Sequence, residues 1–525
     1  MQTQRVIVVG AGIGGLVAAL ELAAQGTEVL VIEAASQPGG KLREVRVGGA
    51  AMDAGPTVFT MRWVFEELFD AIGESLAEHL SLQPVDVLAR HAWSEPERLD
   101  LFADVARSAD AIGAFAGAAA SRGYLDFCAR ARGIYRTLEA PFLCASRPTP
   151  LSLASRGGLR GLPGLLRIAP FSTLWSELGR HFADPRLRQL FGRYATYCGS
   201  SPYLAPATLM LVAHVEQDGV WLVDGGMHRI AQVLAELAVA RGATLRFDSP
   251  VREIVVDQGR ACGVRLDAGE TLLADAVVFN GDAAALAAGR LGPGARRATA
   301  PVAPARRSLS ALTWNLLAPT NGFPLARHTV FFSNDYRAEF DAIFKRGNLP
   351  GSPTVYVCAQ DRGDAGIRVD AAPRSAAERL LLIVNAPATG DARPFTDEEL
   401  SRCEAQTFRS LARCGLQVQR DPAHTLLTTP QDFERLFPAT GGALYGPASH
   451  GWAASFSRPG SRSRLPGLYL AGGSVHPGPG VPMAALSGRQ AAASVLADRS
   501  KAAAARRAST AALHPTATPG GTSMR

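Results

Sequence analysis

The chain opens with a change of hydrophobic pattern. Val6–Val9 are all apolar, which is typical of a strand buried on both faces. Leu16–Ala24 is rich in Ala and Leu and predicts a helix, which Gly26 ends. Glu28–Ile32 predicts a second strand. A strand, a helix and a strand in close succession predict the first unit of an α/β fold around a parallel sheet.

Glycines fill the connection between the first strand and the helix. Gly10, Gly12 and Gly15 form the pattern G-x-G-x-x-G, and Gly14 tightens the turn. The first glycine permits the turn, the second lets a pyrophosphate approach the backbone, and the third lets the helix pack close to the strand. Glu33 follows the second strand, where an acid accepts ribose hydroxyls. A glycine-rich turn without a ligand would not explain this acid, so the sequence predicts a dinucleotide site.

Further along the chain, the hydrophobic pattern predicts two insertions between parts of this α/β unit. The first contains a hairpin and three helices, and the second contains four strands and two helices. Short strands and an Ala-rich helix follow each of them. The expected elements are a hairpin at 85–103, helices at 106–120, 123–138 and 184–197, a strand at 276–279, helices at 335–345 and 397–414, a strand at 468–471 and a helix at 481–497.

We therefore predict an α/β fold with a Rossmann-like dinucleotide-binding domain and an inserted α+β substrate domain. The chain, 525 residues long, is long enough for two or three domains. The predicted boundaries are 1–85, 221–299 and 441–498 for the dinucleotide-binding domain, 86–220 and 300–440 for the substrate domain, and 499–525 for a disordered basic tail.

Residues 156–180 have a different character. Four arginines and one glutamate are interleaved with Leu, Ile, Phe and Trp, and Pro163 and Pro170 interrupt any long helix. Such a helical, membrane-facing segment can lie in a bilayer interface with its arginines on lipid phosphates. A helical lid with solvated arginines is the alternative, and the residues alone leave both open.

Composition narrows the partners. Hydrophobic residues make up 47% of the chain and charged residues 19%, and of the net charge of +7 the stretch from Asp498 carries +4, from five basic residues and one acid. That charge could contact anionic lipid or remain solvated. Seven scattered cysteines without a C-x-x-C pair argue against a disulfide framework and a thiolate metal site. No uncharged apolar run reaches the length of a transmembrane helix. We expect no metal and no nucleic acid.

Further glycine motifs extend the opening unit. Pro38-Gly39-Gly40-Lys41 is a second glycine turn with a cation suited to the far side of a pyrophosphate, and Asp53-Ala-Gly-Pro-Thr57 forces a loop. Gly225-Gly226-Met227 precedes a helix, and a Gly/Pro loop over Gly472–Met483 precedes the last helix, whose N-terminus presents the positive end of its dipole. A plain turn is the alternative reading of each loop.

Together these motifs resemble the FAD-containing amine oxidase and carotenoid desaturase superfamily, and within it the bacterial phytoene-desaturase-type carotenoid desaturases. The resemblance spans nearly all of residues 1–498 and implies FAD, with the 53–57 loop beside the flavin and the backbone at Val251 on the adenine. The implied cofactor-binding residues are Gly10, Ala11, Gly12, Gly14, Gly15, Glu33, Ala34, Gly40, Lys41, Gly55, Pro56, Thr57, Val251, Gly472, Gly473, Gly480, Val481, Pro482 and Met483.

Phe331–Asp341 and Val355–Arg362 resemble the hydroxyneurosporene or methoxyneurosporene desaturase branch. This implies 3,4-desaturation of a 1-hydroxy or 1-methoxy acyclic carotenoid, as from hydroxyneurosporene to demethylspheroidene. Flavin would take a hydride and oxygen or a quinone would be the final acceptor, whereas no residue stands out as a catalytic base. A carotenoid must pass directly between bilayer and pocket, so we expect a peripheral protein on the cytoplasmic face of the inner membrane.

Other activities fit the same fold. A phytoene desaturase, a carotene isomerase, or an amine or protoporphyrinogen oxidase would carry the same cofactor motifs. A prenyl-protein chaperone like the GDP dissociation inhibitors would be non-enzymatic. Those chaperones have lost the full nucleotide signature, which is intact here from Gly10 to Glu33.

Overall fold

The computed structural model describes residues 5–513 except for 147, 150–170, 364–365, 367–368 and 370–375. The predicted opening unit is present as β1 (Arg5–Val9), α1 (Ile13–Ala24) and β2 (Glu28–Ile32). It forms the centre of a parallel five-stranded sheet in the order β21-β13-β1-β2-β9. The other strands are β9 (Thr244–Arg246), β13 (Ala276–Phe279) and β21 (Leu468–Leu470). This sheet therefore joins three distant parts of the chain.

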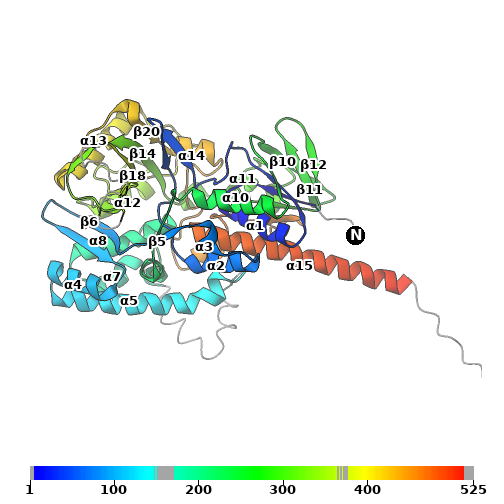
Figure 1. Ribbon diagram of the computed structural model, residues 1–525, viewed down its shortest axis with the longest axis horizontal. Helices are drawn as coiled ribbons and strands as arrows, with labels where there is room; N and C mark the ends of the chain where they lie inside the picture. The colour runs from blue at the N-terminus through cyan, green and yellow to red at the C-terminus, as the bar shows by residue number, and fades with distance from the viewer. Residues whose placement is uncertain are drawn as a thin grey trace, which may run out of the picture.

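Helix α1 lies in the interior, packed between the sheet and two other helices, α10 (Arg229–Ala240) and α15 (Val481–Leu513). Close packing against α15 depends on glycine, because a Cβ at Gly488 would lie 2.3 Å from the carbonyl oxygen of Gly14. An ion pair of 2.9 Å between Arg489 and Glu21 flanks this contact. The start and the end of the fold are thus held together as one unit (Figure 1).

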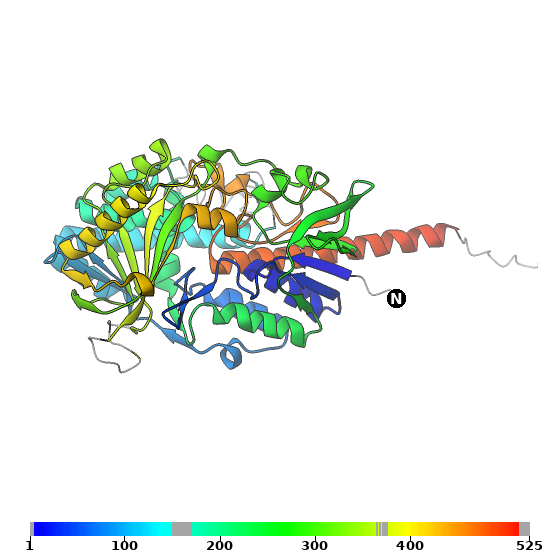
Figure 2. The same ribbon diagram turned by 90° about the horizontal axis from the view of Figure 1, so that it is seen from above.

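A second, seven-stranded sheet lies beside the first, in the order β20-β14-β18-β17-β16-β6-β7. All neighbours are antiparallel except β16 and β6. Figure 2 shows its strands fanning out, with helix α13 (Asp397–Arg413) along the outer face. Its strands are β6 (Val87–Ala92), β7 (Arg98–Phe102), β14 (Ser310–Ala318), β16 (His328–Phe331), β17 (Val355–Ala359), β18 (Glu378–Ala386) and β20 (Thr425–Thr428).

A layer of helices lies beneath this second sheet (Figure 1). Its core is a cluster of aromatic rings, with Phe127 and Phe182 each packed against Phe191 at 4.7 Å between ring centroids. The helices are α4 (Val105–Ala116), α5 (Ala118–Leu138), α7 (Leu174–His181), α8 (Pro185–Gly192) and α9 (Leu211–Asp218), with short 3₁₀ turns at Arg193–Cys198 and Ala207–Met210.

Smaller elements connect these layers. Strands β10, β11 and β12 form a three-stranded antiparallel flap, and the β3-β4 hairpin turns at Gly48 and Gly49. The remaining elements are β3 (Glu44–Val47), β4 (Ala50–Asp53), α2 (Arg62–Ala71), α3 (Leu76–His79), β5 (Leu82–Pro84), β8 (Trp221–Val223), β10 (Val251–Asp257), β11 (Arg260–Leu266), β12 (Thr271–Leu273), α11 (Ala283–Ala287), β15 (Thr320–Gly322), α12 (Tyr336–Asp341), β19 (Leu416–Val418) and α14 (Pro430–Leu436).

Three helices differ from the prediction. Helix α15 continues to Leu513 instead of ending at Ala497, so the prediction of disorder from 499 is wrong over 499–513. The Ala-rich sequence from Lys501 explains this, since Ala has the highest helix propensity. The predicted helix 184–197 becomes 3₁₀ from Arg193, and the predicted helix 335–345 is α-helical only over Tyr336–Asp341 before a π-helical turn.

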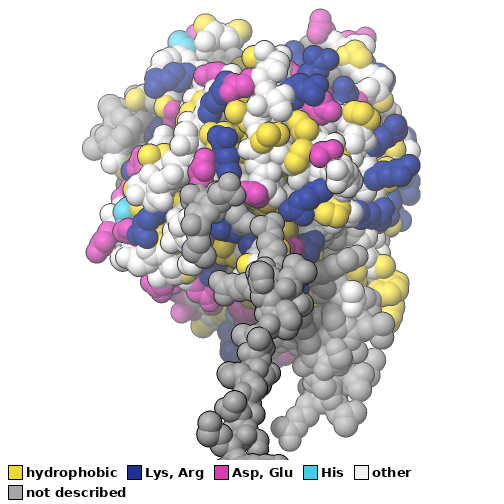
Figure 3. Space-filling model, turned by 90° about the vertical axis from the view of Figure 1, so that its right-hand side faces the viewer, with side chains coloured by type: hydrophobic (Ala, Val, Ile, Leu, Met, Phe, Trp, Pro, Cys, Tyr) yellow, Lys and Arg dark blue, Asp and Glu magenta, His cyan; other side chains and the backbone are white. Residues whose placement is uncertain are grey.

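The end face from which α15 leaves the body mixes basic and acidic side chains with single apolar ones (Figure 3). Residues 514–525 of the predicted tail lie outside the described residues, as does the part of the predicted membrane-facing segment over 156–170. The described remainder of that segment is mostly α7, which Thr173 caps by accepting from Ser176 N at 3.2 Å. No helix among the described residues combines the length and apolar character needed to cross a bilayer.

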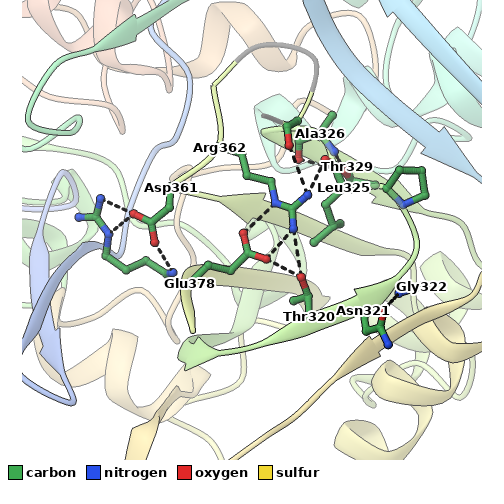
Figure 4. A network of polar contacts seen from close by, with 12 residues as sticks. Thr320, Asn321, Gly322, Leu325, Ala326, Thr329, Asp361, Arg362 and Glu378 are labelled. Carbon is green, nitrogen blue, oxygen red and sulfur yellow. Dashed lines mark hydrogen bonds and ion pairs between the residues drawn. The ribbon is translucent and has the colours of Figure 1, made fainter. Parts of the chain in front are cut away.

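A network of ion pairs joins the end of β17 to the start of β18 in the second sheet (Figure 4). Arg362 donates two hydrogen bonds of 2.7 Å to Glu378, whose side chain is 1% exposed. Nearby, Asp361 binds Arg379, which in turn donates to the carbonyl of Ala51 at 3.0 Å. The second contact links this sheet to the β3-β4 hairpin, and so to the opening unit.

Candidate functional site

A cavity of about 1110 Å³ lies between the two sheets. On one side it reaches the carboxyl ends of β1 and β13, at Val9 and Phe279, where ligands bind in open parallel sheets. On the other side it reaches Thr313, Leu381 and other side chains of the seven-stranded sheet. One continuous space thus touches both the predicted cofactor loops and the second sheet.

All but two of the predicted cofactor residues line this cavity. They come from five separate stretches of the sequence, which the fold brings to one wall. The lining residues are Gly10, Gly12, Gly14, Glu33, Ala34, Gly40, Lys41, Gly55, Pro56, Thr57, Val251, Gly472, Gly473, Gly480, Val481, Pro482 and Met483.

The other two residues, Ala11 and Gly15, support the wall from behind. The backbone N–H of Ala11 donates to the Glu33 carboxylate at 2.6 Å. A Cβ at Gly15 would lie 2.1 Å from the carbonyl oxygen of Gly10, so glycine is what lets α1 pack this close to β1. This agrees with the role predicted for the third glycine of the motif.

Asn280 joins the two glycine loops, a role that the sequence did not reveal. Its side-chain amide donates to the carbonyl of Gly10 at 3.3 Å. A Cβ at Gly12 would lie 2.7 Å from the same amide, and a Cβ at Gly14 would lie 2.7 Å from the backbone nitrogen of Gly472. The opening loop and the C-terminal loop therefore approach so closely that only glycine fits at these positions.

Two motifs that lie far apart in the sequence form one structural unit around Asp53. Its buried carboxylate accepts hydrogen bonds from the backbone N–H groups of Met227 at 2.8 Å and His228 at 3.0 Å. Asn315 and Gln360 of the second sheet donate to its carbonyl at 3.0 and 2.9 Å. Burial raises the pKa of Asp53, and the two backbone hydrogen bonds oppose that shift. Asp53 thus positions the 53–57 loop against both α10 and the second sheet.

Two cations lie in the cavity wall, the half-buried Lys41 and the buried Arg458. The Lys41 ammonium donates to the carbonyl of Leu444 at 2.7 Å and lies 5.2 Å from the ring centroid of Phe437. Arg458 donates to the carbonyls of Tyr445 at 3.0 Å and of Pro447 at 2.7 Å. Burial lowers the pKa of both groups, and the negative charge of Asp282 opposes the shift in each. Both cations bind carbonyl oxygens, which leaves their positive charge to act on the cavity.

A polar chain connects the 53–57 loop to the second sheet. The hydroxyl of Thr57 and Nδ1 of His328 each lie 2.7 Å from the Tyr356 hydroxyl. Burial lowers the pKa of His328 to about 3, so its imidazole is neutral at neutral pH. The chain fixes Tyr356, whose ring lines the cavity next to the loop.

These residues fit an adenine dinucleotide. Loops that accept no Cβ give the backbone close access to a pyrophosphate, and the Glu33 carboxylate lies at the end of β2, where ribose hydroxyls bind. The positive N-terminal end of α15 also lines the cavity, at Val481 and Met483. A two-sheet fold with this cradle defines the class of FAD-dependent oxidoreductases.

The comparisons with known proteins agree with that class. The chain belongs to the flavin containing amine oxidoreductase family, whose model matches residues 13–496. FAD, the cofactor predicted from the sequence, is thereby confirmed. Structures of a putrescine oxidase (15% identity, TM-score 0.57, covering 94% of this chain and 99% of that one) and of cyclohexylamine oxidase from Brevibacterium oxydans (16%, 0.53, 95% and 100%) share the fold.

Curated relatives match over nearly their whole length. The chain is 59% identical to a hydroxyneurosporene desaturase of Rubrivivax gelatinosus, covering 95% of this chain and 94% of the relative. It is 45% identical to a hydroxyneurosporene desaturase of Cereibacter sphaeroides, covering 94% and 98%. The predicted resemblance to carotenoid desaturases, and to this branch of them, is confirmed.

Proposed function

We propose that the chain is an FAD-dependent oxidoreductase that introduces a C-3,4 double bond into a 1-hydroxy or 1-methoxy acyclic carotenoid, as in the desaturation of hydroxyneurosporene. The observation that carries this proposal is the 59% identity to a hydroxyneurosporene desaturase over almost the full length of both chains. The cavity supports it, because one continuous space extends from the glycine cradle to the second sheet. Phytoene desaturation, carotene isomerisation and amine oxidation are less favoured, since both curated relatives reported above are hydroxyneurosporene desaturases.

The second sheet and the helical layer form the substrate domain in this proposal. Apolar side chains from both parts line the cavity and would contact the polyene. Burial of apolar area is favourable by roughly 25 cal/mol per Å², so a long hydrocarbon gains much of its binding energy here without specific polar contacts. The lining apolar side chains are Leu138, Phe142, Leu143, Leu209, Val212, Val215, Val330, Leu381 and Ile383.

The reaction removes a hydride and a proton from adjacent carbons. FAD, when bound, supplies the acceptor for the hydride. The chain positions the cofactor through the glycine loops and Glu33, and its apolar walls exclude water from the reacting bond. The N-terminal end of α15 stabilises negative charge at this end of the cavity by about 0.3–1 kcal/mol. Oxygen or a quinone would take the electrons onward.

Purified protein, FAD and hydroxyneurosporene in liposomes test this function. We expect a product with one more double bond, detected by a red-shifted polyene spectrum and a mass lower by two hydrogens. Parallel reactions under air and under argon with a quinone would identify the acceptor. Conversion of phytoene with no conversion of hydroxyneurosporene would contradict the proposed substrate.

We further infer that the protein docks on the cytoplasmic face of the inner membrane through the mouth of this cavity. Phe171 is 80% exposed and Trp452 is 47% exposed, and their rings are in edge-to-face contact at 5.6 Å between centroids. Both also line the cavity, so an exposed aromatic pair marks its opening. Aromatic rings of this kind favour the interface of a bilayer.

Flotation with anionic liposomes tests this docking. Phe171→Ser with Trp452→Ser should weaken liposome binding, and so should replacing Arg156, Arg160 and Arg167 by Glu. Leu273→Ser is the matched control, because Leu273 is 63% exposed on the flap and does not line the cavity. If the first two variants float as well as the wild type, the docking surface lies elsewhere.

A further inference from the structure

One buried guanidinium in the cavity wall has few partners. Arg193 opens the 3₁₀ turn Arg193–Cys198, is 9% exposed and lines the cavity. Its Nη1 donates to the hydroxyl of Tyr197 over a long 3.4 Å, and its buried Nε has no hydrogen-bond partner among the described residues. A buried charge normally has a full set of hydrogen bonds. Arg193 therefore retains donors for a ligand in the cavity.

Glu216 of helix α9 keeps this guanidinium charged without using up its donors. The Glu216 carboxylate accepts hydrogen bonds from the hydroxyls of Tyr194, at 2.7 Å, and Tyr197. Burial opposes the positive charge of Arg193, but the Tyr197 phenol and Glu216 outweigh this effect and raise the pKa of Arg193. Because the carboxylate already accepts hydrogen bonds from two phenols, the groups of this cluster that remain available to a ligand are the N–H donors of Arg193.

The cluster lies close to the 53–57 loop. Tyr356 and Tyr336 line the same cavity as Arg193. Burial raises the pKa of both phenols, and the positive charge of Arg193 opposes that shift. Tyr356 is the residue whose hydroxyl lies 2.7 Å from that of Thr57 in the loop. The hydroxyl of Tyr336 is buried and has no hydrogen-bond partner among the described residues. Arg193 and Tyr336 therefore leave polar groups without partners in the described part of the chain, in the same cavity wall as Tyr356, which contacts the loop expected beside the flavin.

We propose that Arg193 is a specificity-determining residue that donates a hydrogen bond to the oxygen on C1 of the carotenoid. This inference rests on the proposed function. The oxygen is separated from C4 by four bonds of about 1.5 Å, so it lies within roughly 5 Å of the reacting C3–C4 bond. A polar group that recognises it must consequently lie near the reacting bond, and we place Arg193 there because it lines the same cavity as Tyr356, which contacts the loop expected beside the flavin.

The chemistry of the guanidinium predicts which substrates are accepted. Arginine only donates hydrogen bonds, and both a hydroxyl and a methoxy oxygen can accept one. A carotenoid without an oxygen on C1 would leave the buried donors of Arg193 without a partner, which lowers its transition-state binding. We expect the wild type to prefer 1-hydroxy and 1-methoxy substrates over neurosporene by about 10- to 100-fold in kcat/KM.

The test compares kcat/KM for hydroxyneurosporene, methoxyneurosporene and neurosporene in the holoenzyme. Arg193→Met should bring the ratio of oxygenated substrate to neurosporene close to one. The matched control is Arg188→Met, because Arg188 donates to the carbonyl of Phe182 at 2.6 Å and does not line the cavity. It should leave the ratio unchanged. If Arg193→Met does not fold, Arg193→Met with Glu216→Gln removes both charges and gives the same readout.

Several outcomes would overturn the inference. A merely structural role would lower kcat/KM for all three substrates equally and leave the ratio intact. A wild type that does not discriminate would refute recognition of the oxygen. A preference for the hydroxy substrate alone would instead place an acceptor such as Glu216 at the oxygen, since a methoxy group has no proton to donate. Failure of the proposed function is distinct, because the wild type would then not convert hydroxyneurosporene at all.

Discussion

Replacing Gly15 by Ala tests how the fold holds its cofactor. Gly15 lies in the first turn of α1, and an added Cβ would be 2.1 Å from the carbonyl oxygen of Gly10 and 3.1 Å from the side chain of Asn280. Real Cβ atoms essentially never approach closer than 3.0 Å, so α1 and β1 must separate by at least the difference, about 0.9 Å.

We expect that separation to destabilise the cofactor site. Overpacking of this kind typically costs about 1–3 kcal/mol, and the loop that moves carries Gly12 and Gly14, which line the cavity. If the cost appears mainly in binding, the Kd for FAD rises roughly 5- to 150-fold. Gly133→Ala is the matched control, because Gly133 is also helical, in α5, and its added Cβ would meet nothing within 4 Å. Its Tm should stay the same or rise, since Ala is the better helix former.

Both variants can be titrated with FAD by quenching of flavin fluorescence, and melted with and without excess FAD. We expect Gly15→Ala to lose affinity for FAD and Gly133→Ala to retain it. If Gly15→Ala binds FAD within twofold of the wild type and melts at the same temperature, close packing of α1 on β1 does not form the cofactor site, and the steric reasoning is refuted.

Three further variants test buried polar groups. Asp53→Asn leaves one acceptor oxygen for the two backbone N–H groups that Asp53 binds. Calorimetry should therefore show that the free energy of unfolding falls by about 1–3 kcal/mol, and an unchanged Tm would contradict this. Glu378→Ala leaves the buried charge of Arg362 unpaired and should lower the free energy of unfolding by about 3–5 kcal/mol. A decrease below about 1 kcal/mol would show that water replaces the carboxylate. Burial raises the pKa of Glu339 from 4.5 to about 7, so the folded protein holds a proton that the unfolded chain releases between these values. The stability that Glu339 contributes is therefore complete below pH 4.5 and is lost towards pH 7. Between pH 5 and 8 the Tm of the wild type should fall relative to that of Glu339→Gln. A difference in Tm that does not change with pH would mean that Glu339 has an ordinary pKa.

The local parts of the fold could be predicted because their signals are local. The apolar run at Val6–Val9, the glycines after it and Glu33 fix a strand, a turn and a strand end within a few residues of one another. Helix α15 was underestimated because its last turns lack an apolar face, although alanine favours the helix there.

The site could be predicted only as a set of loops. Asn280 joins two glycine loops, and Asp53 binds the start of α10. Both roles depend on contacts between residues more than 170 positions apart, and the periodicity of the sequence does not reveal such contacts. Arg193 gave no signal at all, since a lone arginine in a helical stretch is normally a solvated residue. Its role can be inferred only from its burial in the cavity wall, which the packed structure shows.

The parallel sheet has a consequence for synthesis of the protein. Its edge strand β21 begins at Leu468, and α15 completes the packing around α1 only after that. At roughly 5–20 residues per second, the ribosome needs about 25 to 95 seconds to reach this point. Until then the opening unit, with its apolar helix α1, lacks β21, α15 and the C-terminal half of the cradle. The nascent chain must therefore be protected from aggregation without help from FAD, and supply of the flavin can rescue only chains that are almost finished.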